Sequence, residues 1–120
     1  MLDSATVSEK SRLFAVRTVR LYQYLCREKK EFTLSKQLLR CGTSIGANIS
    51  EAPCAFSQRE FLAKMYIAFK ESNETMYWLR LLYDTQYLTH SEYLSMKTDC
   101  EELHKMLASI TKTTREKTGK

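Results

Sequence analysis

The stretch LSKQLLRCGTSIGANISEA, residues 34–52, carries the clearest structural signal in the chain. Its apolar residues recur every three or four positions, which is the spacing of side chains on one face of an α-helix. They are Leu34, Leu38, Cys41, Ile45, Ile49 and Ala52. Pro53 follows directly, and proline ends a helix because it lacks the backbone N–H donor and clashes with the preceding turn. This pattern predicts a helix over residues 34–53.

Gly42 and Gly46 lie inside this predicted helix. Each glycine costs about 1 kcal/mol relative to alanine in a helix interior, so another interaction should offset that cost. Together with Thr43, Ser44 and Ala47 they form a surface of small side chains, which would let a neighbouring helix approach closely. A helix broken at Gly42 is the alternative interpretation.

The segment before this stretch is predicted to be helical over residues 8–30. One face of it carries Phe14, Thr18, Leu21 and Leu25. The opposite face carries Arg12, Val16, Arg20 and Arg27. Thr33 or Ser35 is expected to cap the next helix by accepting hydrogen bonds from its exposed backbone N–H groups.

Two capping-box pairs, Ser57 with Glu60 and Thr89 with Glu92, predict helices over residues 58–86 and 91–113. The core face of the third helix is predicted to hold Phe61, Met65, Ala68, Ser72, Met76, Leu79 and Tyr83. That of the fourth is predicted to hold Met96, Cys100, Leu103, Leu107 and Ile110. The polar tail from residue 111 to residue 120 is expected to fray.

These segments predict an all-α fold, an antiparallel up-down-up-down four-helix bundle in a single domain over residues 1–120. The 120 residues suit one domain, and three glycines and one proline are too few for an all-β protein. Short links between helices make consecutive helices antiparallel neighbours.

The third helix has a second apolar face, which one bundle core cannot cover. We therefore expect the chain to associate with itself. The predicted interface residues are Ile67, Tyr77, Trp78 and Leu81.

Positive charge is concentrated in residues 10–40, which carry a net +7 although the whole chain carries +5. Such an excess attracts polyanions through counterion release, so RNA or DNA is the candidate partner. The candidate nucleic-acid-binding residues are Arg12, Arg17, Arg20, Arg27, Lys29, Lys30, Lys36 and Arg40. A solvated basic face without a ligand is the alternative.

Polar residues form a ribbon beside the apolar face of the second helix and on the third. Its members are Gln37, Arg40, Ser44, Asn48, Glu51, Glu71 and Glu74. Glu51 and Glu71 are conceivable as an acid/base pair. We favour a structural role, in which hydrogen bonds and ion pairs, such as Arg40 or Arg80 with a glutamate, hold the helices in register.

No motif predicts catalytic residues, a metal or a cofactor. His90 and His104 match no metal-ligand spacing, and Glu101 with His104 is a single Glu-x-x-His. The glycines lack the Gly-Lys-Ser/Thr of a phosphate loop. The four cysteines form no Cys-x-x-Cys pair and are expected to be reduced. We therefore expect a non-enzymatic protein. We also expect it in the cytoplasm, because no apolar run is long enough for a membrane span or a signal peptide.

Two segments, QLLRCGTSIGANISEA (Gln37–Ala52) and SQREFLAKMYIAFKESNE (Ser57–Glu74), resemble a known family. It comprises the small four-helix-bundle proteins encoded in intervening sequences of bacterial 23S ribosomal RNA genes, also called ribosomal protein S23-like. The resemblance runs from about residue 14 to residue 110. The family places a glycine after the glutamate of its Asn-Ile-x-Glu signature, where this chain has Ala52 and then Pro53.

This resemblance implies antiparallel bundles assembled as a homopentameric ring, without established enzymatic activity. A similar branch, the accessory variability determinant of diversity-generating retroelements, is a basic pentamer that binds a reverse transcriptase and nucleic acid. We therefore expect an oligomer that binds nucleic acid, or a nucleoprotein partner such as a reverse transcriptase, through its first two helices. The alternative is a protein-interaction scaffold that does not bind nucleic acid directly.

Overall fold

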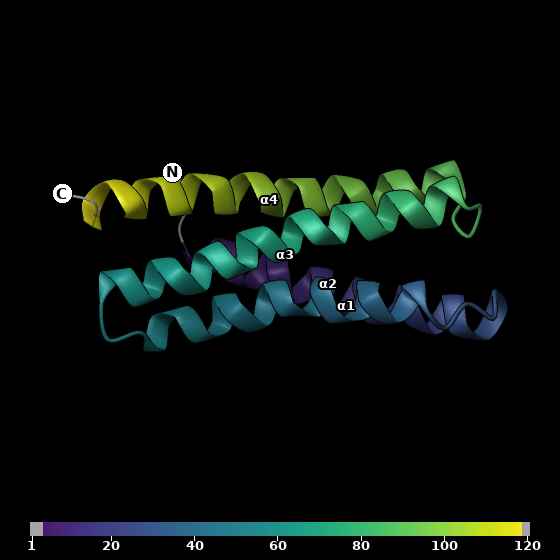
Figure 1. The fold of residues 1–120 in the computed structure, drawn as a ribbon, viewed down its shortest axis with the longest axis horizontal. Helices are drawn as coiled ribbons and strands as arrows, with labels where there is room; N and C mark the ends of the chain where they lie inside the picture. The colour runs from purple at the N-terminus through teal and green to yellow at the C-terminus, as the bar shows by residue number, and fades with distance from the viewer. Residues whose placement is uncertain (1–3, 119–120) are drawn as a thin grey trace.

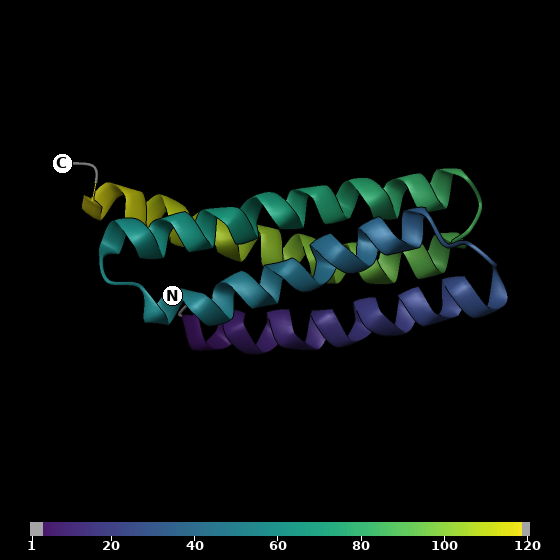
Figure 2. The same ribbon diagram turned by 60° about the horizontal axis from the view of Figure 1, so that its bottom comes forward.

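The computed structural model describes residues 4–118, which form four long α-helices and one short 3-10 helix. The α-helices are α1 (Ser4–Glu28), α2 (Leu34–Glu51), α3 (Gln58–Asp84) and α4 (His90–Thr118), and the 3-10 helix η1 covers Ala52–Cys54. No strand occurs within this described part, so the predicted all-α class is confirmed. Figures 1 and 2 show the four α-helices side by side along an axis of 49 Å, with their connections at alternate ends.

The α-helices bury one shared core, and the predicted apolar faces of α1, α2 and α4 point into it. Phe14, Leu25, Leu38, Ile45 and Leu103 are each at most 2% exposed. The arginines predicted on the opposite face of α1 are exposed. Helical periodicity therefore predicted the inner and outer faces of these three helices.

The buried face of α3 differs from the predicted one in its C-terminal half. Thr75 and Leu82 are fully buried, whereas Met76 and Tyr83 are only half-buried. The buried positions advance alternately by three and four residues, which is the repeat of helices that pack with their axes nearly aligned. The prediction chose the larger apolar neighbour at each step, although a threonine is buried readily when its hydroxyl is bonded. Thr75 Oγ1 donates to the Glu71 carbonyl at 2.7 Å.

The end of α4 was also predicted wrongly, because the helix continues to Thr118 instead of fraying after residue 110. Thr111 and Thr114 are only 9% and 7% exposed. Thr111 Oγ1 donates to the Leu107 carbonyl at 2.8 Å, which satisfies its hydroxyl inside the helix. These threonines extend the buried face by one further turn.

The corner after α2 needs no glycine. Ala52 is 1% exposed and has helical dihedral angles, φ −57° and ψ −40°. Its carbonyl accepts the N–H of Ala55 at 3.1 Å, which closes η1. Pro53 lies at the start of this turn, where a missing N–H leaves no helix bond unmade.

α1 and α2 approach each other most closely at the two glycines. A Cβ atom on Gly42 would lie 2.6 Å from Cγ2 of Thr18, and one on Gly46 would lie 3.3 Å from the carbonyl oxygen of Ser11. Thr18 is fully buried, and its hydroxyl donates to the Phe14 carbonyl at 2.9 Å. α2 is continuous through both positions, so the alternative of a break at Gly42 is wrong. The predicted close approach of a neighbouring helix is confirmed.

The start of α2 is capped by Glu31 and not by the predicted Thr33 or Ser35. The Glu31 carboxylate accepts the backbone N–H groups of Thr33 at 3.2 Å, Leu34 at 2.9 Å and Ser35 at 2.7 Å. Glu31 is 7% exposed. Burial by itself raises the pKa of Glu31, but these backbone hydrogen bonds outweigh it and hold that pKa below its ordinary value.

The predicted capping box at Thr89 is complete, and that at Ser57 is made in one direction, because the Glu60 carboxylate accepts the N–H of Phe56 instead of that of Ser57. Glu60 N–H donates to Ser57 Oγ and Glu92 N–H donates to Thr89 Oγ1, each at 3.1 Å. Glu92 Oε1 accepts the N–H of Thr89 at 2.9 Å, as a capping box requires. These boxes determine where α3 and α4 begin.

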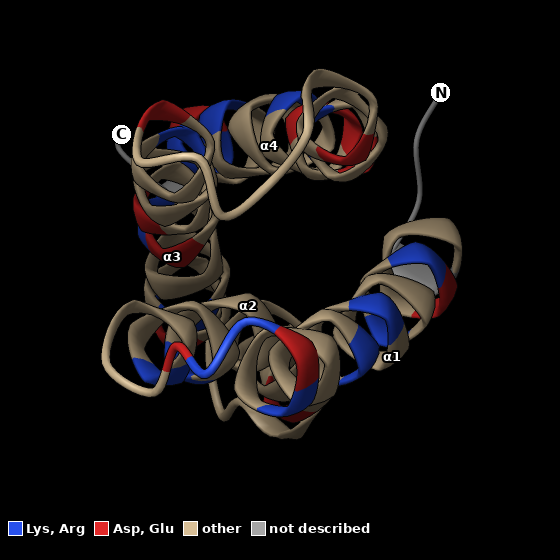
Figure 3. Cartoon of the chain, turned by 90° about the vertical axis from the view of Figure 1, so that its right-hand side faces the viewer, with Lys and Arg blue, Asp and Glu red and all other residues tan. Residues whose placement is uncertain are grey.

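α1 packs less closely against α4 than against α2. Ion pairs span this looser side: Arg17 Nη1 lies 2.7 Å from Asp99 Oδ2, and Lys10 Nζ lies 3.2 Å from Glu102 Oε2. Arg17 Nη2 also donates to Ser95 Oγ at 2.8 Å. Figure 3, which looks along the bundle, shows α1 and α4 bordering this side of the bundle.

Gly42→Ala is expected to destabilise the protein by about 1–2 kcal/mol, because overpacking against Thr18 outweighs the helix-propensity gain. Thr18→Ala removes the clashing methyl group, so adding Gly42→Ala to it should cost little. Urea unfolding of the two single variants and the double variant measures this coupling. Equal costs of Gly42→Ala in both backgrounds would contradict the steric explanation.

Glu31→Gln is expected to lower the free energy of unfolding by about 1–2 kcal/mol at pH 7, because the three N–H groups lose a charged acceptor. The lowered pKa means that Glu31 stabilises the fold above about pH 4.5, the ordinary value for glutamate, and that this contribution is lost as the pH falls through the folded-state pKa. The difference between wild type and variant in urea unfolding should therefore shrink between pH 7 and pH 3. Glu28→Gln, an exposed neighbour, is the control, and a pH-independent difference would contradict the assignment.

Candidate nucleic-acid interface

The eight predicted nucleic-acid-binding residues divide into paired and unpaired cations. Arg12 Nη2 lies 2.8 Å from Glu9 Oε2 on the exposed face of α1. Arg17 is held by Asp99 and Ser95 of α4, and Arg40 is held by two glutamates of α3. The charges of these three are already neutralised within the molecule.

Four of the other five cations lie at the junction of α1 and α2, and the fifth, Arg20, lies about two turns before the end of α1. The five are Arg20, Arg27, Lys29, Lys30 and Lys36. All are exposed, and none forms an ion pair with another residue in the range 4–118. Figure 3 shows basic segments in blue along α1 and on the connection to α2. Uncompensated cations on one end of a protein raise the local concentration of polyanions.

The α1–α2 connection is held in one conformation. The Leu25 carbonyl accepts two N–H groups from it, that of Lys29 at 3.2 Å and that of Glu31 at 3.0 Å. Lys30 lies between them with a left-handed backbone, φ 55°. The Glu31 carboxylate is turned inward to cap α2, so it does not neutralise the neighbouring lysines at the surface.

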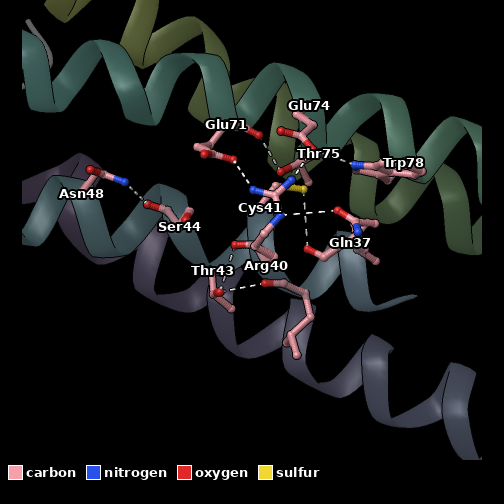
Figure 4. Close-up of polar contacts among 12 residues, drawn as sticks. Gln37, Arg40, Cys41, Thr43, Ser44, Asn48, Glu71, Glu74, Thr75 and Trp78 are labelled. Atoms are coloured by element: carbon pink, nitrogen blue, oxygen red, sulfur yellow. Dashed lines mark hydrogen bonds and ion pairs between the residues drawn. The ribbon is translucent and has the colours of Figure 1, made fainter. Parts of the chain in front are cut away.

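The predicted polar ribbon lies between α2 and α3, as Figure 4 shows. Arg40 Nη1 lies 3.4 Å from Glu71 Oε1, and Arg40 Nη2 bonds to Glu74 Oε2. Glu74 also accepts the indole N–H of Trp78 at 3.0 Å. Gln37 Oε1 accepts from Arg40 Nε at 3.4 Å. Arg40 is therefore the centre of a network that joins the two helices.

The rest of the ribbon is engaged separately. Asn48 Nδ2 donates to the Ser44 carbonyl at 2.9 Å within α2. Glu51 pairs with Lys64 at 2.6 Å, two turns into α3. No contact in the described chain joins Glu51 to Glu71, and Arg80 pairs with Asp84 on its own helix instead of crossing to another. The geometry accordingly favours the structural interpretation of the ribbon over an acid/base pair.

A serine and a histidine that the sequence analysis did not connect meet between α3 and α4. Ser72 Oγ lies 2.8 Å from His104 Nδ1, and the His104 ring stacks on Phe69 at 4.5 Å between centroids. Burial lowers the pKa of His104. Ser72 is fully buried and its hydroxyl also bonds to the Phe69 carbonyl at 2.6 Å, so a substrate has no access to it. The sequence holds no signal for a contact between residues 32 positions apart.

The four cysteines are free thiols. Burial raises the pKa of Cys41 to about 11 and that of Cys100 to about 12, which makes both poor nucleophiles. Among residues 4–118, no three His, Cys, Asp or Glu side chains gather as a metal site would require. Nor does any described helix have the length and apolar character to cross a bilayer.

The predicted oligomer interface is only partly exposed in the single chain. Ile67 and Tyr77 are 38% and 59% exposed. Trp78 and Leu81 are half-buried, and Trp78 packs against the core edge-on to Tyr77, with 5.0 Å between ring centroids. A second exposed apolar strip, on α1, was not predicted as a site and consists of Leu13, Val16 and Val19.

Comparisons with known proteins agree with this architecture. A family model described as 23S rRNA-intervening sequence protein matches residues 3–109. A crystal structure of a protein of unknown function from the S23 ribosomal protein family of Bacteroides thetaiotaomicron is 52% identical in sequence, with a TM-score of 0.91. The match covers 92% of this chain and 99% of that one. No curated protein matches the chain in sequence.

Proposed function

The chain belongs to the 23S rRNA-intervening sequence protein family, and we propose that it is a non-enzymatic, oligomeric bundle that binds nucleic acid or a nucleoprotein partner. The binding surface is the basic end, which we define as Arg20, Arg27, Lys29, Lys30 and Lys36. We also propose that the protein acts in the cytoplasm as one antiparallel up-down-up-down domain without a cofactor.

The observation that supports this function is that the five cations of the basic end form no ion pair within residues 4–118, although the exposed Glu28 lies among them. Three of the eight candidate cations have ion-pair partners, whereas the five of the basic end have none in the described structure. Each cation that contacts a phosphate releases counterions, so binding should weaken steeply as salt is added. For four or five phosphate contacts, log K should fall with log salt with a slope of about −4.

Self-association would strengthen this binding. We propose that Ile67, Tyr77, Trp78 and Leu81 meet other copies of the chain, in the homopentameric ring that the family resemblance implies. A ring places several basic ends on one polyanion, and linked sites bind more tightly than a single site does.

The second candidate is a protein-interaction scaffold, and the exposed strip on α1 favours it. Leu13, Val16 and Val19 are 50%, 40% and 38% exposed on one continuous face, an arrangement that suits an apolar partner surface. A reverse transcriptase or another protein is the candidate occupant. A protein partner that remains bound after nuclease treatment would support this function over direct nucleic-acid binding.

Replacing Arg20 and Arg27 with alanine is expected to weaken nucleic-acid binding at least tenfold at 50 mM salt, because two phosphate contacts are lost. Fluorescence anisotropy with labelled RNA and DNA at 50 and 200 mM salt measures this loss. The control is the double variant Arg12→Ala with Arg59→Ala, which removes the same charge outside the basic end and should change the affinity much less. Wild-type binding that is undetectable at 50 mM salt, or indifferent to salt, would refute the proposal.

Ile67→Glu combined with Tyr77→Glu is expected to dissociate the oligomer without unfolding it, because both side chains are exposed in the single chain. Light scattering at micromolar concentration should show a defined oligomer for wild type and a smaller species for the variant. Leu94→Glu, at an α4 position of similar exposure, is the control and should leave the mass unchanged. A wild-type protein that scatters as a 14.0 kDa monomer would exclude self-association at this concentration.

A further inference from the structure

The looser side of the bundle holds a groove between α1 and α4. It has a volume of about 420 Å³, and its walls include Leu21 and Tyr24 from α1 and Glu92 and Met96 from α4. Arg17, with its bonds to Asp99 and Ser95, borders it. The groove therefore combines an apolar lining with polar groups at its edges, as sites for planar organic ligands do.

A second hollow of about 260 Å³ lies next to the first, nearer the end of α1, and is lined by α1 residues. The two hollows share Arg20 and Tyr24, and the second adds Arg27 and Glu28. Tyr24 thus borders both hollows. The two hollows are therefore neighbours, and the second lies beside Arg27 of the basic end. We refer to the two hollows together as the groove.

Tyr24 differs from four of the six other tyrosines of the chain, which each have an aromatic neighbour. Its ring is half-buried and packs against the core, and it borders both hollows. Tyr66, Tyr83 and Tyr93 each stack on a neighbouring ring, and Tyr77 meets Trp78 edge-on. Tyr24 has no ring partner, and its hydroxyl forms no hydrogen bond within residues 4–118. The part of Tyr24 that borders the hollows is therefore not covered by another aromatic ring.

The charges around the groove select what can enter it. Arg17 is neutralised by Asp99, and the carboxylates of Glu92 and Glu28 repel a phosphate. Arg20 and Arg27 are exposed and unpaired and line the second hollow, and Arg20 also borders a hollow on the outer face of α1. These charges favour a ligand that places a neutral planar group in the groove and its phosphates near Arg20 and Arg27.

We infer that the groove accepts an unpaired nucleobase, which stacks on Tyr24 while Arg20 and Arg27 bind the adjoining phosphates. This inference rests on the proposed function and narrows it to single-stranded RNA or DNA. Aromatic rings bind every unpaired base, whereas a duplex keeps its bases stacked and presents only phosphates. The protein should therefore prefer a single strand to a duplex of the same sequence.

Tyr24→Leu tests the stacking contact, because it removes the ring and keeps an apolar side chain against the core. Affinity for a labelled 15-nucleotide single strand is expected to fall about 5- to 100-fold, the range found when base-stacking aromatic residues are removed. Tyr24→Phe retains the ring and should bind like wild type. Tyr87→Leu, at a half-buried tyrosine outside the groove, is the matched control and should also leave affinity unchanged.

A second measurement reports base stacking itself instead of affinity. A single strand that contains 2-aminopurine should lose fluorescence on binding to wild type, because stacking on Tyr24 quenches it, and the Tyr24→Leu variant should abolish the quenching. Duplex affinity should be the same for wild type and Tyr24→Leu. Circular dichroism checks that each variant retains its helices.

The outcomes separate this inference from the proposed function. Salt-dependent binding with equal affinity for single strand and duplex, unchanged by Tyr24→Leu, would overturn the groove and leave the basic end as the binding surface. The absence of any binding at 50 mM salt would overturn both. Single-strand preference that is lost with Tyr24→Leu and retained with Tyr24→Phe supports both.

Discussion

The contact between Thr18 and the bare backbone at Gly42 sets the spacing on which the rest of the bundle depends. Here α1 lies so close to α2 that a Cβ atom at position 42 would clash with Thr18, so only glycine fits without a shift. On the other side of α2, Arg40 joins the helix to α3 through Glu71 and Glu74. Because α1 is committed to α2, its side facing α4 is left less closely packed, and polar contacts span it. The groove beside Tyr24 follows from this unequal packing.

The same structure separates charges that have a structural task from charges that do not. Glu31 is turned inward to the start of α2, and Arg17 and Arg40 join helices that are far apart in sequence. Charged residues of this kind are counted in the net charge of the chain, but their charged groups are held by partners within the molecule and are not available to a ligand. At the α1–α2 junction Glu31 faces the backbone and the exposed Glu28 forms no ion pair in the described chain, so the nearby lysines remain unpaired. The surplus that a charge count assigns to residues 10–40 is therefore concentrated at one end of the molecule.

Much of the fold follows from periodicity and capping motifs, since Leu38 and Ile45 lie inward and the Ser57 and Thr89 boxes begin α3 and α4. The errors have a common physical cause, which is that a polar side chain can be buried once a local partner satisfies it. Thr75, Thr111 and the carboxylate of Glu31 are such cases. For the site, the sequence predicts a basic region but not its paired members, because Asp99 lies 82 residues from Arg17. The groove beside Tyr24 depends on how two helices diverge, which no local pattern encodes.

Lys30 shows how local geometry and charge compete at the basic end. Its backbone is left-handed, a conformation that costs an L-amino acid about 1–2 kcal/mol and that glycine adopts freely. A glycine there would make the same turn with less strain but without an ammonium group. The turn that reverses the chain thus also holds the backbone of an exposed lysine in a defined position. A polyanion that meets this turn finds the charge already in place, with little further ordering of the backbone required.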